Sequence, residues 1–197
     1  MAPVFRSATE ARHQLHQEFP SLAAANWRVK SPLDSNYQCI AWAACRTDRV
    51  WWPWDDPRFY WPPGFKKLPL CSSVPVSSFV EVFEKKFGYR CCEGSAFEFG
   101  YQKVAIYANT TGVTHMARQH LWGFGWLSKL GEVEDILHHK LSDVEGDVNP
   151  ASWQYGRVVQ IMKRSWWAAL RRLCLFRSSW ASLRFWFYRR AKPWDLA

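Results

Sequence analysis

The hydrophobic pattern changes its period near Gly88, and this change constrains the fold more than any other feature of the sequence. Residues 77–88 carry apolar side chains at the spacing of an amphipathic helix, and a glycine closes the run. Beyond it, short apolar segments are separated by Gly and Asn turns, which is typical of strands. Helices therefore come first and an antiparallel meander follows, so the sequence predicts the α+β fold class.

The same pattern places the expected elements along the chain. A helix is expected over residues 5–24, interrupted at Pro20, and a second should begin between Asn36 and Gln38. Short strands are expected at residues 97–99, 103–109, 113–121, 125–130 and 155–162, with a helix over 132–141. Residues 50–75 contain six Pro and four Trp, which excludes long regular structure, so we expect a loop that packs over the core.

The basic character of the chain lies almost entirely at its C-terminal end. The 197 residues carry a net charge of +9; residues 163–197 contain nine Lys or Arg and one acid, whereas the remainder contains 17 bases and 16 acids. A nucleic-acid-binding domain usually carries a basic face on its folded body, so we expect no nucleic-acid partner. We predict two parts: a papain-like α+β body over residues 1–164 and a helical tail over residues 165–197.

The tail combines aromatic and basic residues in a pattern that favours a helix at a membrane surface. Residues 165–197 contain five Trp and an apolar stripe at steps of three and four. Arg side chains within the stretch make a membrane span costly, and no apolar run reaches the roughly 18 to 20 residues of a spanning helix. We predict that residues 165–197 bind an anionic membrane surface. The alternative is a helix packed on the body or a poorly ordered extension.

The six cysteines show no spacing typical of a metal site or a disulfide framework. Cys91 and Cys92 are adjacent, and no CxxC or HxxxH pattern occurs. The N-terminal residues are polar and lack the apolar core of a secretion signal. We therefore expect a cytoplasmic protein with all six thiols reduced. A phosphate-binding glycine pattern is also missing from the sequence, so we expect no metal and no other cofactor.

Cys39 is the strongest candidate for chemistry, because it falls in the first turn of a helix predicted to be buried. The helix dipole and free backbone N–H groups there should lower the pKa of its thiol, and the Cys39 N–H should contribute to an oxyanion hole. A thiolate nucleophile needs a base, and His115 opens a predicted strand downstream. Ser128 on the next strand, or Asp135 in the expected helix over 132–141, would orient the imidazole.

Six short blocks resemble an uncharacterised bacterial domain family with a Y-N-C-I-A-W-A signature. The blocks are YQCIAWA (37–43), the WWPW…YWP loop (51–62), KVAIY (103–107), THMARQ (114–119), WLSKLG (126–131) and YGRVV (155–159). The resemblance covers roughly residues 25–164, and Gln38 stands where the family has Asn. A Cys opening a helix, a His opening a strand and a polar residue on the next strand further resemble papain-like cysteine hydrolases. This resemblance implies a thiol-dependent hydrolase or acyltransferase that acts on amide or isopeptide bonds of a protein or peptide.

Other interpretations fit the same residues. Cys39 and His115 could both be core side chains, and the domain would then be catalytically silent and bind a protein partner through its aromatic loop. A third hypothesis is a toxin-like protein in which the tail is the active part. His138 and His139 close the expected helix and should be structural there. The substrate and the oligomeric state stay open at this point.

Overall fold

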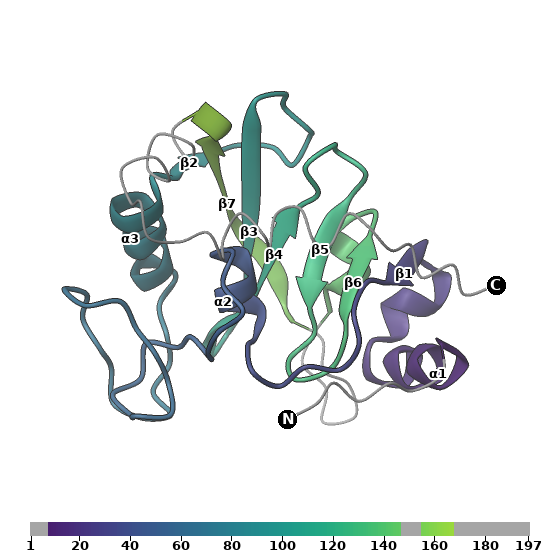
Figure 1. Ribbon diagram of the computed structural model, residues 1–197, viewed down its shortest axis with the longest axis horizontal. Helices are drawn as coiled ribbons and strands as arrows, with labels where there is room; N and C mark the ends of the chain where they lie inside the picture. The colour runs from purple at the N-terminus through teal and green to yellow at the C-terminus, as the bar shows by residue number, and fades with distance from the viewer. Residues whose placement is uncertain (1–7, 147–154, 168–197) are drawn as a thin grey trace.

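The α+β fold class is confirmed by the computed structural model, which describes residues 8–146 and 155–167. Seven strands form one antiparallel sheet in the order β1-β6-β5-β4-β3-β7-β2 (Figure 1). The strands are β1 (Trp27–Val29), β2 (Arg90–Cys92), β3 (Tyr101–Asn109), β4 (Gly112–Gln119), β5 (Trp126–Lys129), β6 (Asp135–His138) and β7 (Arg157–Ser165). The helices are α1 (Ala8–Glu18), α2 (Cys39–Ala43) and α3 (Val76–Phe87), with 3-10 turns η1 (Pro20–Ala24) and η2 (Leu141–Val144).

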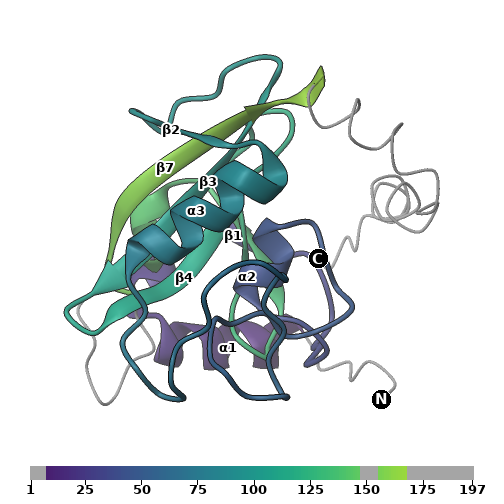
Figure 2. The ribbon, with the colours of Figure 1, turned by 90° about the vertical axis from the view of Figure 1, so that its left-hand side faces the viewer.

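The sheet separates two hydrophobic clusters, because successive side chains of a strand point to opposite faces. On β3, Val104 and Ile106 join a cluster with α2 and α3, whereas Ala105 and Tyr107 join a cluster with α1 and η1. Figure 2 shows α3 lying across the strands on the side that also carries α2. Both faces of the central strands are therefore buried, which explains their nearly continuous apolar sequence.

The Trp/Pro stretch forms a packed loop on the α2 and α3 face, as predicted. Trp51 and Trp61 are buried in the first cluster, where Trp51 packs on Tyr60 with ring centroids 4.9 Å apart. Trp61 packs edge-on against Phe79 of α3. The aromatic side chains of this loop thus complete the core instead of lining an open cleft.

Two predictions from local pattern are wrong. Residues 132–141 do not form a helix; Asp135–His138 is the strand β6, which pairs with β5 on one side and with β1 on the other. Hydrogen bonds to two neighbouring strands outweigh the helix-compatible pattern of this segment. Residues 97–99 form no strand, because the chain there crosses from β2 at the sheet edge past β7 to β3.

Other boundaries agree with the sequence or shift slightly. The first helix breaks at Pro20 as predicted, and α3 begins one residue earlier than predicted, after Pro75. Within the described residues, no helix is both long and apolar enough to span a membrane. The predicted tail helix lies outside the described residues from position 168 onward.

Candidate functional site

Cys39 lies in the first turn of α2, as predicted, although the helix begins at Cys39 itself and not between Asn36 and Gln38. Gln38 precedes it with an extended backbone, and the Gln38 side chain donates a hydrogen bond to the Trp51 carbonyl at 2.8 Å, which ties the helix start to the aromatic loop. All five residues of α2 are buried, because its sequence, CIAWA, has no polar face. The Cys39 side chain is 4 % exposed.

The sulfur of Cys39 lies where β5 stops pairing with β4. The β4–β5 ladder runs only from Gln119 to Ala117, so Met116 lies one residue beyond its last pair. The backbone N–H of Met116 donates a hydrogen bond to the Cys39 thiol, and the N–H groups of Cys39 and Ile40 do the same. We call this place the β4–β5 fork and define it by Cys39, His115, Met116 and Ser128.

His115 and Ser128, both predicted site residues, are hydrogen-bonded to each other at the fork. His115 Nε2 lies 3.0 Å from Ser128 Oγ, and Ser128 Oγ lies 2.9 Å from His138 Nε2. His138 Nδ1 in turn lies 2.7 Å from the carbonyl oxygen of Lys140. His115, Ser128 and His138 are fully buried, so this chain of hydrogen bonds is shielded from water.

The hydrogen bond to the Lys140 carbonyl determines which nitrogen of each imidazole carries the proton. A carbonyl only accepts, so His138 carries its proton on Nδ1, and its Nε2 must accept when the ring is neutral. The Ser128 hydroxyl therefore donates to His138 and accepts from His115 Nε2–H. This leaves His115 Nδ1 unprotonated, and it is buried with no hydrogen-bond partner among residues 8–146 and 155–167.

Burial keeps both imidazoles neutral. Burial and, to a smaller extent, the charge of His138 hold the pKa of His115 well below its usual range. Burial also lowers the pKa of His138 to about 4, against a weaker opposing effect of its hydrogen bond to Lys140. Tyr155 covers His115 with its ring plane nearly parallel, 4.0 Å between centroids, and Tyr107 contacts the imidazole edge-on.

The thiol of Cys39 is neutral in this structure, contrary to the lowered pKa expected from its position. Burial raises the pKa of Cys39 to about 11 and outweighs the hydrogen bonds from Met116, Ile40 and Cys39 itself. His115 Nδ1 makes no hydrogen bond with the sulfur. The structure therefore hydrogen-bonds the neutral thiol of Cys39 to the backbone of Met116, the residue after His115. The His115 imidazole packs on Tyr107 and Tyr155, which belong to the cluster on the α1 face of the sheet, whereas Cys39 belongs to the cluster on the α2 face.

Asp135 lies in a different network from His115. Its carboxylate accepts hydrogen bonds from the Tyr37 hydroxyl at 3.0 and 3.2 Å, and its backbone N–H donates to Ser31 Oγ. Lys129 pairs with Asp135 across the β5–β6 ladder, with its ammonium over the Tyr37 ring. Asp135 thus anchors the segment before α2, and Ser128 is the residue that orients His115.

Sequence reasoning missed His138 and Tyr155 as parts of this site. The expected helix over 132–141 concealed His138, whose side chain reaches Ser128 only because β6 lies beside β5. Tyr155 follows residues outside the described part and packs on His115 from far along the chain. The only signal for it was the block YGRVV at 155–159, which has no chemistry of its own.

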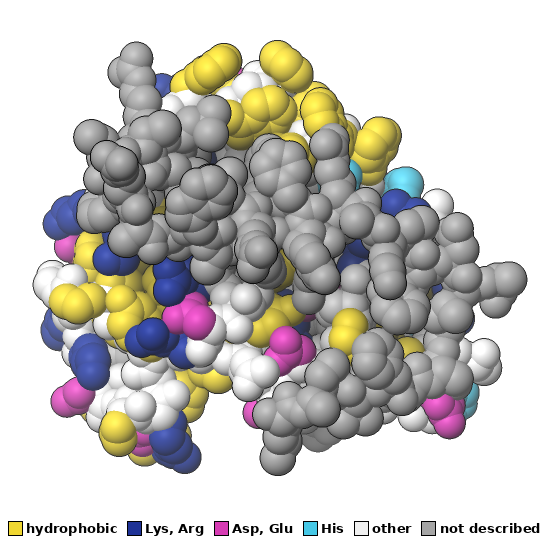
Figure 3. All heavy atoms as spheres, viewed as in Figure 1, with side chains coloured by type: hydrophobic (Ala, Val, Ile, Leu, Met, Phe, Trp, Pro, Cys, Tyr) yellow, Lys and Arg dark blue, Asp and Glu magenta, His cyan; other side chains and the backbone are white. Residues whose placement is uncertain are grey.

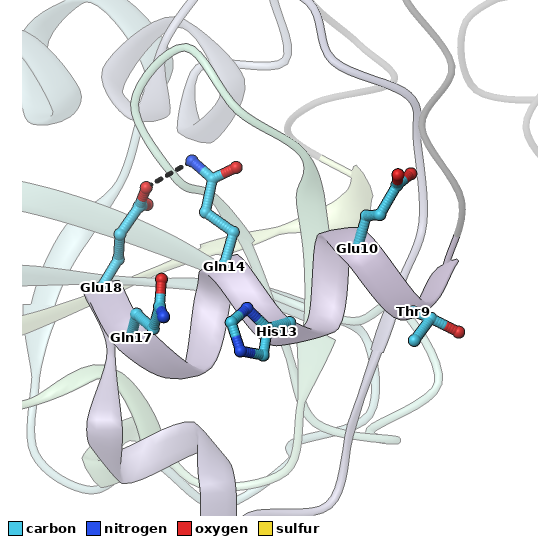
Figure 4. A pocket seen from close by; sticks show the side chains of 6 residues that line it. All are labelled: Thr9, Glu10, His13, Gln14, Gln17 and Glu18. Atoms are coloured by element: carbon cyan, nitrogen blue, oxygen red, sulfur yellow. Dashed lines mark hydrogen bonds between the residues drawn. The ribbon is translucent and has the colours of Figure 1, made fainter.

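Surface hollows lie elsewhere on the molecule. One is lined by polar side chains of α1, among which Gln14 donates to Glu18 at 2.6 Å (Figure 4). Another, of about 600 Å³, lies by the β4–β5 turn and η2, and its lining includes Trp126 and His139. Neither contains Cys39 or His115. No group of three or more potential metal ligands occurs in the part of the chain that the structure describes.

Comparisons with known proteins identify a family without identifying an activity. No curated protein and no solved structure matches the sequence. Residues 28–163 match a family described as a domain of unknown function, DUF7689, and this span runs from β1 to β7 and includes the whole fork. Since the match covers more than half of the 197 residues, the chain belongs to the DUF7689 family.

Proposed function

We propose that this protein is a thiol-dependent hydrolase or acyltransferase that acts on an amide or isopeptide bond, with Cys39 as nucleophile and His115 as base. The observation that carries the proposal is the proton order of the buried chain, which leaves His115 Nδ1 unprotonated and, within the described part of the protein, without a hydrogen-bond partner. A core histidine would be expected to satisfy both ring nitrogens, so the unpaired Nδ1 favours a catalytic base.

The proposed reaction requires the Cys39 thiol and the His115 imidazole to approach each other, because in the described structure His115 Nδ1 makes no hydrogen bond with the sulfur. His115 Nδ1 removes the proton of Cys39, and the thiolate attacks the carbonyl carbon of the amide. Ser128 accepts the His115 Nε2–H throughout and holds the ring in one orientation. The imidazolium then protonates the departing amine, and water or a second amine releases the thioester. A papain-like arrangement and a cytoplasmic location, where thiols stay reduced, belong to the same proposal.

Catalysis requires a rearrangement, because the resting site is closed. Cys39 is 4 % exposed and His115 is fully buried, so a substrate carbonyl has no path to the sulfur. Opening would admit water and so reduce the burial of both groups. Because burial raises the pKa of Cys39 and lowers the pKa of His115, opening would bring the two pKa values closer together and favour proton transfer from the thiol to the imidazole. A closed, neutral resting state also protects the thiol from side reactions.

The test is turnover of a panel of fluorogenic peptide amides and isopeptides by matched variants. Cys39→Ser and His115→Gln should abolish cleavage, since they remove the nucleophile and the base. Cys71→Ser and His120→Gln are the controls and should leave cleavage unchanged, because Cys71 is exposed and His120 lies at the far end of β4. Cleavage that survives Cys39→Ser would contradict the mechanism. Failure to cleave any member of the panel would favour a catalytically silent binding domain.

A second candidate function, binding to an anionic membrane surface, rests on a group of exposed aromatic side chains. The aromatic patch consists of the exposed residues Phe97, Phe99, Trp122, Phe124 and Trp167, of which Phe99 is 76 % and Trp167 73 % exposed, and of the half-buried Trp166, whose ring contacts Phe99 and Trp122. Figure 3 shows hydrophobic side chains gathered along the upper edge of the molecule. Lone exposed apolar residues are ordinary, whereas a contiguous group marks an interaction surface.

Charge argues for an anionic surface as the partner of the aromatic patch. The patch ends at Trp167, where the chain continues into residues 168–197, and residues 163–197 contain nine Lys or Arg and one acid. The patch residue Phe99 lies beside Glu98, whose carboxylate is neutralised by Lys163 at 2.7 Å. Aromatic rings suit the interface of a bilayer, and each basic residue near an anionic surface adds about 1 kcal/mol.

Vesicle sedimentation tests this second candidate. The full chain should bind vesicles that contain phosphatidylserine and release them as salt is raised. Trp122→Ala combined with Phe124→Ala should weaken binding, whereas Leu70→Ala, an exposed apolar residue on the Trp/Pro loop, should not. Equal binding to neutral vesicles, or no effect of the patch variants, would contradict the candidate.

A further inference from the structure

Cys45 lies between two arginines from strands far along the chain. Arg118 Nη1 of β4 is 2.9 Å from Cys45 Sγ, and Arg164 Nη2 of β7 is 3.6 Å from it. Gln102 of β3, the strand between them, accepts a hydrogen bond from Arg164 at 2.8 Å and one from Tyr89 at 3.2 Å. Two guanidinium groups thus converge on the sulfur of Cys45, a residue of intermediate exposure.

An ionised Cys45 sulfur would neutralise one of the two positive charges in this cluster. Neither Arg118 nor Arg164 pairs with a carboxylate among residues 8–146 and 155–167; the faces of Trp42 and Tyr89 lie against their guanidinium groups at 4.3 and 4.8 Å. Arg118 is 8 % exposed, and Arg164 Nε is buried with no hydrogen-bond partner in the described part of the chain. Two buried guanidinium groups and one thiolate leave a net positive charge of one. This charge would stabilise a second negative charge that develops next to the sulfur.

The backbone at Cys45 is strained in a way that glycine would relieve. α2 ends in a Schellman motif, in which Cys45 N–H bonds to Trp42 O at 3.0 Å and Arg46 N–H bonds to Ala41 O at 2.8 Å. The residue at the left-handed position of this motif is usually Gly, and here it is Cys45 with φ of 60°. A side chain kept at a strained position is a frequent feature of functional sites.

We infer that Cys45, held between Arg118 and Arg164, is a reactive thiolate and a site of oxidation by hydroperoxides. The thiolate attacks one oxygen of the hydroperoxide, the O–O bond breaks, and a hydroxide or alkoxide departs and takes a proton from water. The sulfur loses two electrons and becomes a sulfenic acid, and the peroxide is reduced to water or an alcohol. The two guanidinium groups stabilise the negative charge that develops on the leaving oxygen.

The electrostatics separate Cys45 from the other described thiols. Burial of Cys45 opposes ionisation, but the charges of Arg118 and Arg164 and their hydrogen bonds together lower the pKa of its thiol. Burial raises the pKa of Cys39 to about 11 and raises those of Cys91 and Cys92. Reactivity toward peroxide follows the thiolate fraction and access to the sulfur, and Cys45 alone among these four combines a lowered pKa with partial exposure.

The experiment treats the full chain with hydrogen peroxide, traps sulfenic acids with dimedone and maps the adducts by mass spectrometry. Cys45 should be labelled on the order of tenfold faster than the exposed Cys71. Arg118→Gln and Arg164→Gln should each slow labelling of Cys45 by about tenfold, whereas Arg28→Gln, an exposed arginine on β1, should not. Cys39→Ser should leave labelling of Cys45 unchanged, which separates this inference from the proposed hydrolase.

Two further measurements keep the test decisive if an arginine variant fails to fold. Cys45→Gly relieves the left-handed strain, so it should fold and lose the adduct. In the unmodified protein, the pH dependence of Cys45 alkylation by iodoacetamide should show a midpoint below the value of about 8.5 for a free cysteine. Faster oxidation of Cys71, a midpoint above that value, or arginine variants that fold yet label at the original rate would each overturn the inference.

Discussion

Acidification should destabilise this protein through its buried imidazoles. Burial lowers the pKa of His138 from 6.5 to about 4, so the unfolded chain binds a proton in this range that the folded protein does not. Stability is therefore complete above pH 6.5 and falls as the pH drops toward 4, by about 1.4 kcal/mol per pH unit and about 3 kcal/mol across the window. The pKa of His115 is displaced in the same direction, so His115 adds to the loss.

Urea unfolding between about pH 7 and about pH 5 measures this effect, because the slope of the unfolding free energy against pH counts the protons taken up on unfolding. His138→Gln should lower that slope by about one proton near pH 5. The exposed neighbour His139 supplies the control, and His139→Gln should retain most of the slope, because the charge of His139 is the smallest of the named effects on the pKa of His138. An identical slope in His138→Gln and the unmodified protein would refute the assignment of His138 as a buried neutral imidazole.

Three further predictions test the fork and the sheet. Ser128→Ala should reduce the unfolding free energy by about 2 to 5 kcal/mol in urea, because it leaves two buried imidazole nitrogens unpaired; a loss below about 1 kcal/mol would contradict the hydrogen-bond chain. Gly156→Ala should lower the melting temperature, since Gly156 has φ of +74° and an added Cβ would collide with the Ala108 carbonyl. Gly64→Ala is the control: Gly64 has φ of +85° but open space around it, so this variant should show only the smaller loss that backbone strain causes. Native Cys39 should resist iodoacetamide at neutral pH and react once urea unfolds the chain, so equal rates in both states would disprove its burial.

Local sequence patterns predicted the elements whose signals are local. Cys39 lies in the first turn of a helix as predicted, since an extended polar residue precedes a short apolar run, although the helix begins slightly later than the predicted start between Asn36 and Gln38. The Pro20 break and the end of α3 at Gly88 also follow from the conformational limits of those two residues. The expectation of an uncharacterised domain family over roughly residues 25–164 agrees with the family found over residues 28–163.

The segment EVEDILHHKL shows where local patterns fail. Its apolar residues are compatible with a helix, yet Asp135–His138 forms β6 because β1, more than a hundred residues earlier, and β5 both pair with it. Pairing partners of this kind are absent from any local window of sequence. The error also concealed His138, which the fold places next to Ser128.

The sequence by itself determined that His115 and Ser128 lie on neighbouring strands and that Cys39 lies in the first turn of a helix; the structure hydrogen-bonds His115 to Ser128 and the Cys39 thiol to the backbone of Met116. Only the tertiary structure decided their protonation. Burial reversed the expected acidity of Cys39, and the Lys140 carbonyl, acting through His138 and Ser128, assigned the proton of His115. The opposite environment of Cys45 likewise depends on arginines 73 and 119 residues further along the chain. The physical reason is that charge and hydrogen bonding act across space, between groups whose separation only the folded chain defines.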